Sequence, residues 1–102
     1  MGDRMPDTEQ AFRQVLDDAF SLWQKKHQAY GPYNISYFGE RGILVRVWDK
    51  VQRLLRLVWN GVENPLNNET IDDTWMDIAI YCLIALLVRR GQWPKEHGDI
   101  NV

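Results

Sequence analysis

Residues 69–90 read ETIDDTWMDIAIYCLIALLVRR, and this segment decides the fold. Acidic residues stand at its start, and an apolar run of eleven residues then extends from Ile78 to Val88. Because such a run covers every face of a helix, it predicts a central, buried helix, but one too short to cross a bilayer. Thr70 and Asp73 match a capping box, which is typical of a helix start. We therefore expect a helix over about residues 69–90.

Two further helices are expected where apolar residues recur every three or four positions. The first covers about residues 8–28, and the glycine and proline that follow it favour a helix end. The second covers about residues 43–60. Its apolar stripe, which we expect in the core, consists of Leu44, Val47, Trp48, Val51, Leu54, Leu55 and Val58.

The remaining segments are expected to be irregular. Residues 30–42 are predicted to form a loop, and residues 92–102 a tail. Loops of this length in small domains are more often functional than idle. No useful β-type alternation occurs, so residues 1–102 are predicted to form a single all-α domain with three main helices.

Composition bounds the classes of function. The net charge of -2 gives no polyanion-binding signature, so we expect no stable DNA or RNA binding. A single cysteine and an N-terminus without an apolar signal segment favour the cytoplasm, and no membrane association is expected. Five tryptophans and four tyrosines favour a binding surface or a subunit interface, and therefore a homo-oligomer.

Three acids are spaced so that they share one helical face. Glu69, Asp73 and Asp77 follow one another at intervals of four residues. Like charges at this spacing repel, so a cation or basic side chains should face them. Carboxylates are the ligands that Mg²⁺ prefers, and Asp49 could assist from the preceding helix. The alternative is an acid–base network that ties the two helices together without a ligand.

A mainly basic stripe lies on the expected helix 43–60. Arg46, Lys50 and Arg53 are suitable partners for phosphate, although a solvated face is the alternative. In the expected loop 30–42, Tyr30, Tyr33 or Tyr37 could stack on a base. The predicted ligand-binding set consists of these three cations with Tyr30, Tyr33 and Asn34.

Three motifs carry a family resemblance. They are YGPxNI at 30–35, GIxxRxxDKxxRL at 42–54 and ETxxDTxxDIAxY at 69–81. Together they resemble the nucleotide-modification-associated domain family, which consists of small phage proteins related to the MazG-like all-α nucleotide pyrophosphohydrolases. The resemblance covers about residues 25–88 and implies a MazG-like helical bundle.

The resemblance also implies a magnesium site. In MazG-like enzymes, an E-x-x-E pair on one helix and an E-x-x-D pair on the next bind Mg²⁺. Asp77 resembles the aspartate of the second pair, and Asp73 lies one residue from the place of its glutamate. Both are the implied catalytic residues, and the implied metal ligands are Glu69, Asp73, Asp77 and Asp49. The first acidic pair is replaced by Asp49-Lys50-x-x-Arg53, which weakens metal binding and strengthens phosphate binding.

We therefore expect a phage-type protein that binds a nucleotide or a nucleotide-derived small molecule in the cytoplasm, which is the host cytoplasm if a phage encodes it. One version is a Mg²⁺-dependent nucleoside triphosphate pyrophosphohydrolase. Another is a non-catalytic binder that sequesters a nucleotide signal. A third is a purely structural helical oligomer.

Overall fold

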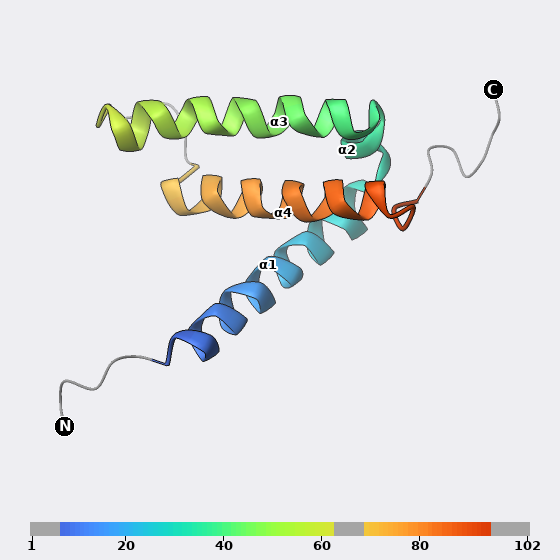
Figure 1. Cartoon of the computed structure of the whole chain (residues 1–102), viewed down its shortest axis with the longest axis horizontal. Helices are drawn as coiled ribbons and strands as arrows, with labels where there is room; N and C mark the ends of the chain where they lie inside the picture. Colours follow the sequence, from blue (N-terminus) through green and yellow to red (C-terminus); the bar gives the residue numbers. More distant parts are fainter. Residues whose placement is uncertain (1–6, 63–68, 95–102) are drawn as a thin grey trace.

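The computed structural model describes residues 7–62 and 69–94, and the regular structure within them is entirely helical (Figure 1). The predicted all-α class is confirmed, and the described residues form four α-helices in place of the expected three, because a short one precedes the second long helix. The expected tail 92–102 lies mostly outside the described residues. The elements are α1 (Thr8–Tyr30), α2 (Tyr33–Ser36), α3 (Gly39–Leu54), a π-helical continuation η1 (Leu55–Trp59) and α4 (Ile71–Arg89).

Helix α1 begins and ends at local signals in the sequence. The Asp7 carboxylate accepts a hydrogen bond from the Gln10 backbone N–H at 3.1 Å, as an N-cap residue does. At the other end, Gly31 has a φ of 74° and donates its backbone N–H to the His27 carbonyl at 2.8 Å. Glycine adopts this left-handed conformation without strain, so the helix runs to Tyr30.

Segment 30–42 is not the loop that the sequence predicted. It contains α2, and α3 begins at Gly39 in place of residue 43. Gly42 lies inside α3, where a Cβ atom would meet the Cβ of Phe38 at 2.9 Å. The absence of a side chain at Gly42 therefore leaves room for the Phe38 side chain. The sequence pattern had favoured a helix boundary at this position.

The later helix ends agree closely with the sequence. Asn60 donates its backbone N–H to the Leu55 carbonyl at 2.9 Å, a π-type bond that closes η1 before Gly61. At the start of α4, the Asp73 N–H donates to the Thr70 hydroxyl at 3.0 Å. The Thr70 N–H donates to the Asp73 carboxylate at 3.1 Å, which completes the predicted capping box.

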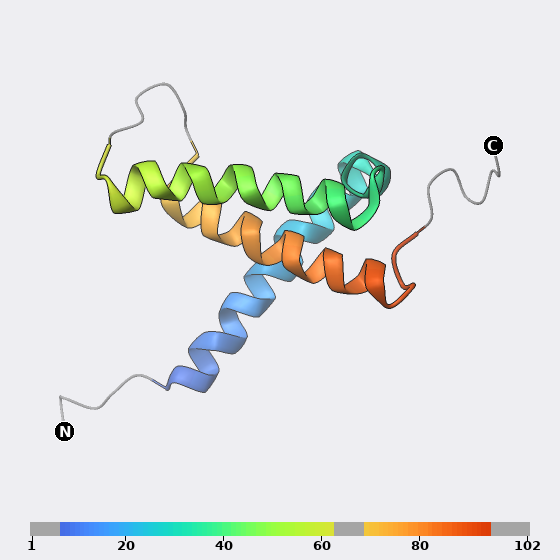
Figure 2. The same ribbon diagram turned by 45° about the horizontal axis from the view of Figure 1, so that its top comes forward.

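Helices α3 and α4 form an antiparallel pair, and α1 lies across it. Figures 1 and 2 show α3 beside α4, whereas α1 crosses α4 obliquely and its N-terminal half projects away from both. The buried cluster lies where α1, α3 and α4 meet the chain after α4. It consists of Ala19, Ile43, Ile80, Ile84 and Trp93.

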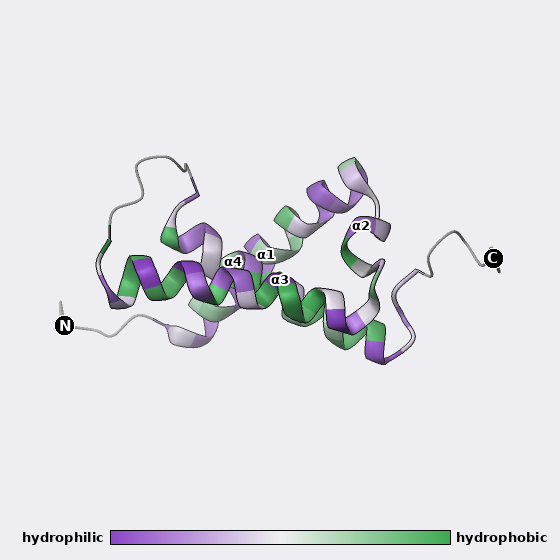
Figure 3. Cartoon of the chain, turned by 90° about the horizontal axis from the view of Figure 1, so that it is seen from above, coloured by the Kyte–Doolittle hydropathy of each residue, from purple (hydrophilic) through white to green (hydrophobic). Residues whose placement is uncertain are grey.

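The expected core stripe of the second helix is only partly buried. Leu54 is buried, and Val47 and Val51 are half-buried. The exposed members are Leu44, Trp48, Leu55 and Val58. Helix α3 has α4 on one side only, and that side carries Ile43 and the basic residues that pair with the acids of α4. Figure 3 shows hydrophobic residues along α3 in the view from above.

Helix α4 is the central helix, as the sequence predicted, because it packs against both α3 and α1. It is not covered on every side. Trp75, Leu83 and Leu86 are exposed, and so is Cys82. Among the described residues, no helix combines the length and the apolar character needed to cross a membrane.

Ile43 and Leu44 offer a matched test of this packing. Ile43 is 1% exposed and its neighbour Leu44 is 67% exposed. We expect Ile43→Ala to lower the free energy of unfolding by about 3 kcal/mol, because it leaves a cavity in the core. Leu44→Ala should change it by less than about 0.5 kcal/mol. Urea unfolding followed by circular dichroism measures both, and equal effects would contradict this orientation of α3.

Candidate functional site

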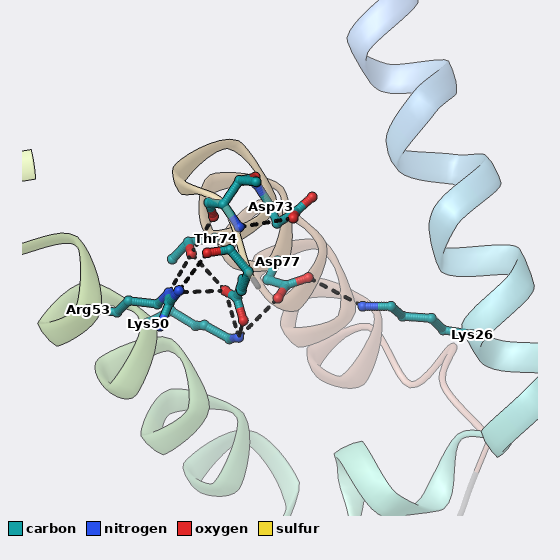
Figure 4. Close-up of polar contacts among 8 residues, drawn as sticks. Lys26, Lys50, Arg53, Asp73, Thr74 and Asp77 are labelled. Carbon is teal, nitrogen blue, oxygen red and sulfur yellow. Dashed lines mark hydrogen bonds and ion pairs between the residues drawn. The ribbon is translucent and has the colours of Figure 1, made fainter. Parts of the chain in front are cut away.

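Lys50 lies at the centre of a charged network between α3 and the start of α4 (Figure 4). Its Nζ donates to Glu69 Oε1 at 2.9 Å and to Glu69 Oε2 at 3.0 Å. The same Nζ lies 3.0 Å from Asp77 Oδ2. The side chains of all three residues are largely shielded from solvent. One ammonium group therefore holds two carboxylates that would otherwise repel each other.

Arg53 and Thr74 fix the position of Glu69. Arg53 donates from Nε to the Thr74 hydroxyl at 3.1 Å and from Nη2 to the Glu69 backbone carbonyl at 2.6 Å. The Thr74 hydroxyl donates to Glu69 Oε2 at 2.6 Å. Thr74 is fully buried, so its hydroxyl must have partners, and this network supplies them. Glu69 precedes the Thr70 cap and is nevertheless held against α3.

The remaining predicted acids do not join Glu69 and Asp77. The Asp73 carboxylate caps the N-terminus of its own helix. Asp49 is exposed on α3 and lines a shallow depression. At the outer edge of the network, Lys26 of α1 lies 3.5 Å from Asp77 Oδ1.

A magnesium ion does not fit these side chains as they are arranged. Glu69 and Asp77 converge on one point, but the Lys50 ammonium occupies it. Within residues 7–62 and 69–94, no group of three or more His, Cys, Asp or Glu side chains is placed to hold a metal ion. A divalent ion could bind between the two carboxylates only if Lys50 moved away.

The network shifts the pKa of its members. Burial raises the pKa of Glu69, but the hydrogen bonds from Thr74 and Lys50 and the charges of Lys50 and Arg53 outweigh it, so the pKa is lowered. Burial likewise lowers the pKa of Lys50, but the bonds to Glu69 and Asp77 outweigh it and the pKa is raised. The hydrogen bonds with Thr70 lower the pKa of Asp73. Each shift favours the charged form.

A cavity of about 260 Å³ lies directly beside the network. Asp77 belongs to both, because its carboxylate binds Lys50 and also lines the cavity. Two cations, Lys26 and Arg46, contribute to the wall. Arg46 of α3 donates from Nη2 to the Asn34 backbone carbonyl at 2.7 Å. This hydrogen bond holds α2, which forms part of the cavity wall, against α3.

Aromatic rings form much of the rest of the wall. His27 stacks on Trp23 with ring centroids 4.8 Å apart, and Trp93 lies edge-on to His27 at 5.4 Å. Tyr30 and Tyr81 also line the cavity. Trp93 is buried, and its indole N–H has no hydrogen-bond partner among the described residues. An unsatisfied buried donor costs about 1–3 kcal/mol.

The structure divides the predicted ligand-binding set. Tyr30, Asn34 and Arg46 line the cavity, whereas Lys50 and Arg53 bind acids of the protein itself. Tyr33 is not part of the cavity lining.

Sequence reasoning missed several lining residues, although one signal was present. Trp23, Lys26 and Tyr30 follow one another at three and four residues and so share a face of α1. Trp93 and Tyr81 come from distant segments, and no local spacing connects them with α1.

Comparisons of the chain with protein-family models, with curated proteins and with solved structures found no match. The resemblance to the nucleotide-modification-associated domain family therefore stays a prediction that rests on the three sequence motifs.

The pKa shifts predict a stability plateau with two edges. The stabilisation from Glu69 is full above its ordinary pKa of 4.5 and is lost as the pH falls through its lower, folded-state pKa. The stabilisation from Lys50 is full below its ordinary pKa of 10.5 and is lost as the pH rises through its higher, folded-state pKa.

The acidic edge can be tested with Glu69→Gln. We expect this change to lower the free energy of unfolding by about 1–2 kcal/mol near neutral pH, because it removes charged hydrogen bonds. The difference from the wild type should shrink once the pH lies below the folded-state pKa of Glu69. Urea unfolding at a series of pH values measures it, and Asp17→Asn, which removes an exposed carboxylate of α1, is the control. A difference that did not depend on pH would contradict the network.

Proposed function

We propose that the chain binds a nucleotide or a nucleotide-derived anion in the cavity beside Asp77, and that it does so without turnover. The observation that supports this most is the combination of aromatic walls with Lys26 and Arg46 in a single concave site. Bases stack on aromatic side chains, with about 1–3 kcal/mol per base. Arginine and lysine are suited to bind phosphate.

The cavity volume favours a small ligand. Its size of about 260 Å³ lies near the lower end of the range for ligand sites, which is roughly 300–1,000 Å³. A mononucleotide fits this volume better than a dinucleotide. We place the phosphate near Arg46 and the hydrogen-bond donors of the base or sugar near the Asp77 carboxylate. That carboxylate would repel the phosphate, and Lys26, whose Nζ lies 3.5 Å from Asp77 Oδ1, offsets its charge.

A Mg²⁺-dependent nucleoside triphosphate pyrophosphohydrolase is the second candidate. The observation in its favour is that Glu69 and Asp77 converge on one cationic point, as metal-binding carboxylates do. The ammonium at that point is the reason for placing binding first, because Lys50 would have to be displaced before a divalent ion could enter.

The setting of this function is part of the same proposal. We place the protein in the cytoplasm of a phage-infected host, where nucleotides are abundant, and we propose that it acts as an oligomer. The single cysteine supports the cytoplasmic location. The exposed apolar faces support the oligomer.

Lys26 and Lys25 provide the test of the binding site. Both side chains are exposed, but Lys26 lines the cavity and its neighbour Lys25 does not. We expect Lys26→Ala to weaken binding of a mononucleotide about tenfold, because the Asp77 carboxylate then faces the phosphate without that counter-charge, and Lys25→Ala to leave it unchanged. Isothermal titration calorimetry with a panel of nucleoside mono- and triphosphates measures both. Equal effects of the two changes, or no binding in the panel, would contradict the proposal.

The same panel separates binding from hydrolysis. Incubation with Mg²⁺ and measurement of released pyrophosphate should show no turnover if the chain is a binder. Pyrophosphate release that is lost in Asp77→Asn would instead establish the hydrolase.

A further inference from the structure

The N-terminal half of α1 is an apolar arm without cover. Figures 1 and 2 show it projecting away from α3 and α4. Phe12 is 67% exposed, Val15 55%, Leu16 47% and Phe20 56%. Isolated helices shorter than about 12–15 residues are marginally stable in water, because packing of an apolar face supplies most helical stability in proteins. The arm therefore needs a packing partner.

The arm continues into an apolar groove at its base. The groove has a volume of about 280 Å³ and lies between α1 and α4. Leu16 and Phe20 belong to both the arm and the groove, and Leu83 of α4 forms part of the opposite wall. Arm and groove thus form one continuous apolar face.

The size of this face suits a protein interface. From the exposed fractions of its large side chains, we estimate an exposed apolar area on the order of 600 Å², where a standard interface buries about 800 Å² per partner. The largest apolar patch on a typical monomer is roughly 300–600 Å² and is often functional.

The charge distribution along α1 points to the partner. Residues 7–18 carry four acids, Asp7, Glu9, Asp17 and Asp18, against one arginine. Residues 19–30 carry Lys25 and Lys26 and no acid. Two copies of this helix that lie antiparallel therefore place the acidic half of each against the basic half of the other. Glu9 is exposed and stands three residues before Phe12 and seven before Leu16, so it borders the apolar face.

We propose that this face binds a second copy of the chain, with the two α1 helices antiparallel across a two-fold axis. The same surface then serves both subunits, as in most homodimers. Each arm covers the apolar face of the other, and the acidic and basic halves set the direction of the pair.

This interface adjoins the proposed ligand cavity. Trp23 and Ile80 line both the apolar groove and the cavity. A second copy that fixes these side chains changes the affinity of the cavity, and by linkage the ligand changes dimer affinity by the same factor. This last step rests on the proposed function, whereas dimerisation itself does not.

Dimerisation is tested without any ligand. We expect the wild type to sediment as a dimer in analytical ultracentrifugation and Phe12→Glu/Leu16→Glu to raise the dimer dissociation constant by about 100-fold or more. The control is Val45→Glu/Trp48→Glu, which adds the same charge to the outer face of α3, where these residues are 59% and 60% exposed. It should remain dimeric. Circular dichroism checks that both variants are folded.

Three results would overturn the proposal. The wild type could be a monomer throughout the concentration series, the α3 variant could abolish the dimer while the arm variant keeps it, or the monomer could bind phosphatidylcholine vesicles through the arm. The last result would assign the arm to a membrane surface.

Reversal of one charge tests the antiparallel arrangement. Glu9→Lys should weaken the dimer about threefold, because Glu9 borders the apolar face and would face the basic half of the other copy. An unchanged dimer affinity would overturn the arrangement.

Titration of a nucleoside monophosphate into the monomeric arm variant tests the linkage. Unchanged affinity would exclude it, whereas a wild type that binds no nucleotide would contradict only the proposed function.

Discussion

The ammonium group of Lys50 is the point on which the arrangement of α3 and α4 depends. It lies within 3.0 Å of oxygen atoms from both Glu69, which precedes α4, and Asp77, which lies within α4. Without a cation there, two partly buried carboxylates would face each other across a region of reduced dielectric, and their repulsion would separate the helices. Arg53 and the buried Thr74 hydroxyl also contact the Glu69 carboxylate, at Oε2. The side of α3 that faces α4 is therefore partly polar by necessity.

This polar contact determines where a ligand could bind. Because Lys50 and Arg53 are engaged by acids of the protein, their charges are largely neutralised, and they offer little attraction to a phosphate. The adjoining cavity is lined by Arg46 of α3 and by Lys26 of α1, whose side chain is exposed and pairs with Asp77 at the longer distance of 3.5 Å. Asp77 connects the two regions, since one carboxylate oxygen binds Lys50 and the other lies near Lys26.

The sequence predicts the parts of this structure that depend on neighbouring residues. The cap of α4 at Thr70 and the end of the second long helix before Gly61 follow from side chains within one turn. The approach of Lys50 to the acids was also predictable, because a spacing of four residues places like charges on one face and requires a counter-charge. The start of α3 was not, since the helical role of Gly42 depends on Phe38. Neither was the cavity, whose wall includes Trp93 from a distant segment.

The apolar pattern of α3 shows a limit of a different kind. Periodicity predicts which residues share a face, but it does not say which neighbour covers that face. Trp48 and Leu44 fit a core stripe, yet α4 packs against the other side of the helix, so both are exposed in a single chain. The same holds for Phe12 on α1. Residues 7–62 and 69–94 thus carry more apolar face than three crossing helices can bury. Exposed apolar surface of this extent is unfavourable in water, and the proposed dimer would bury the part of it that lies on α1.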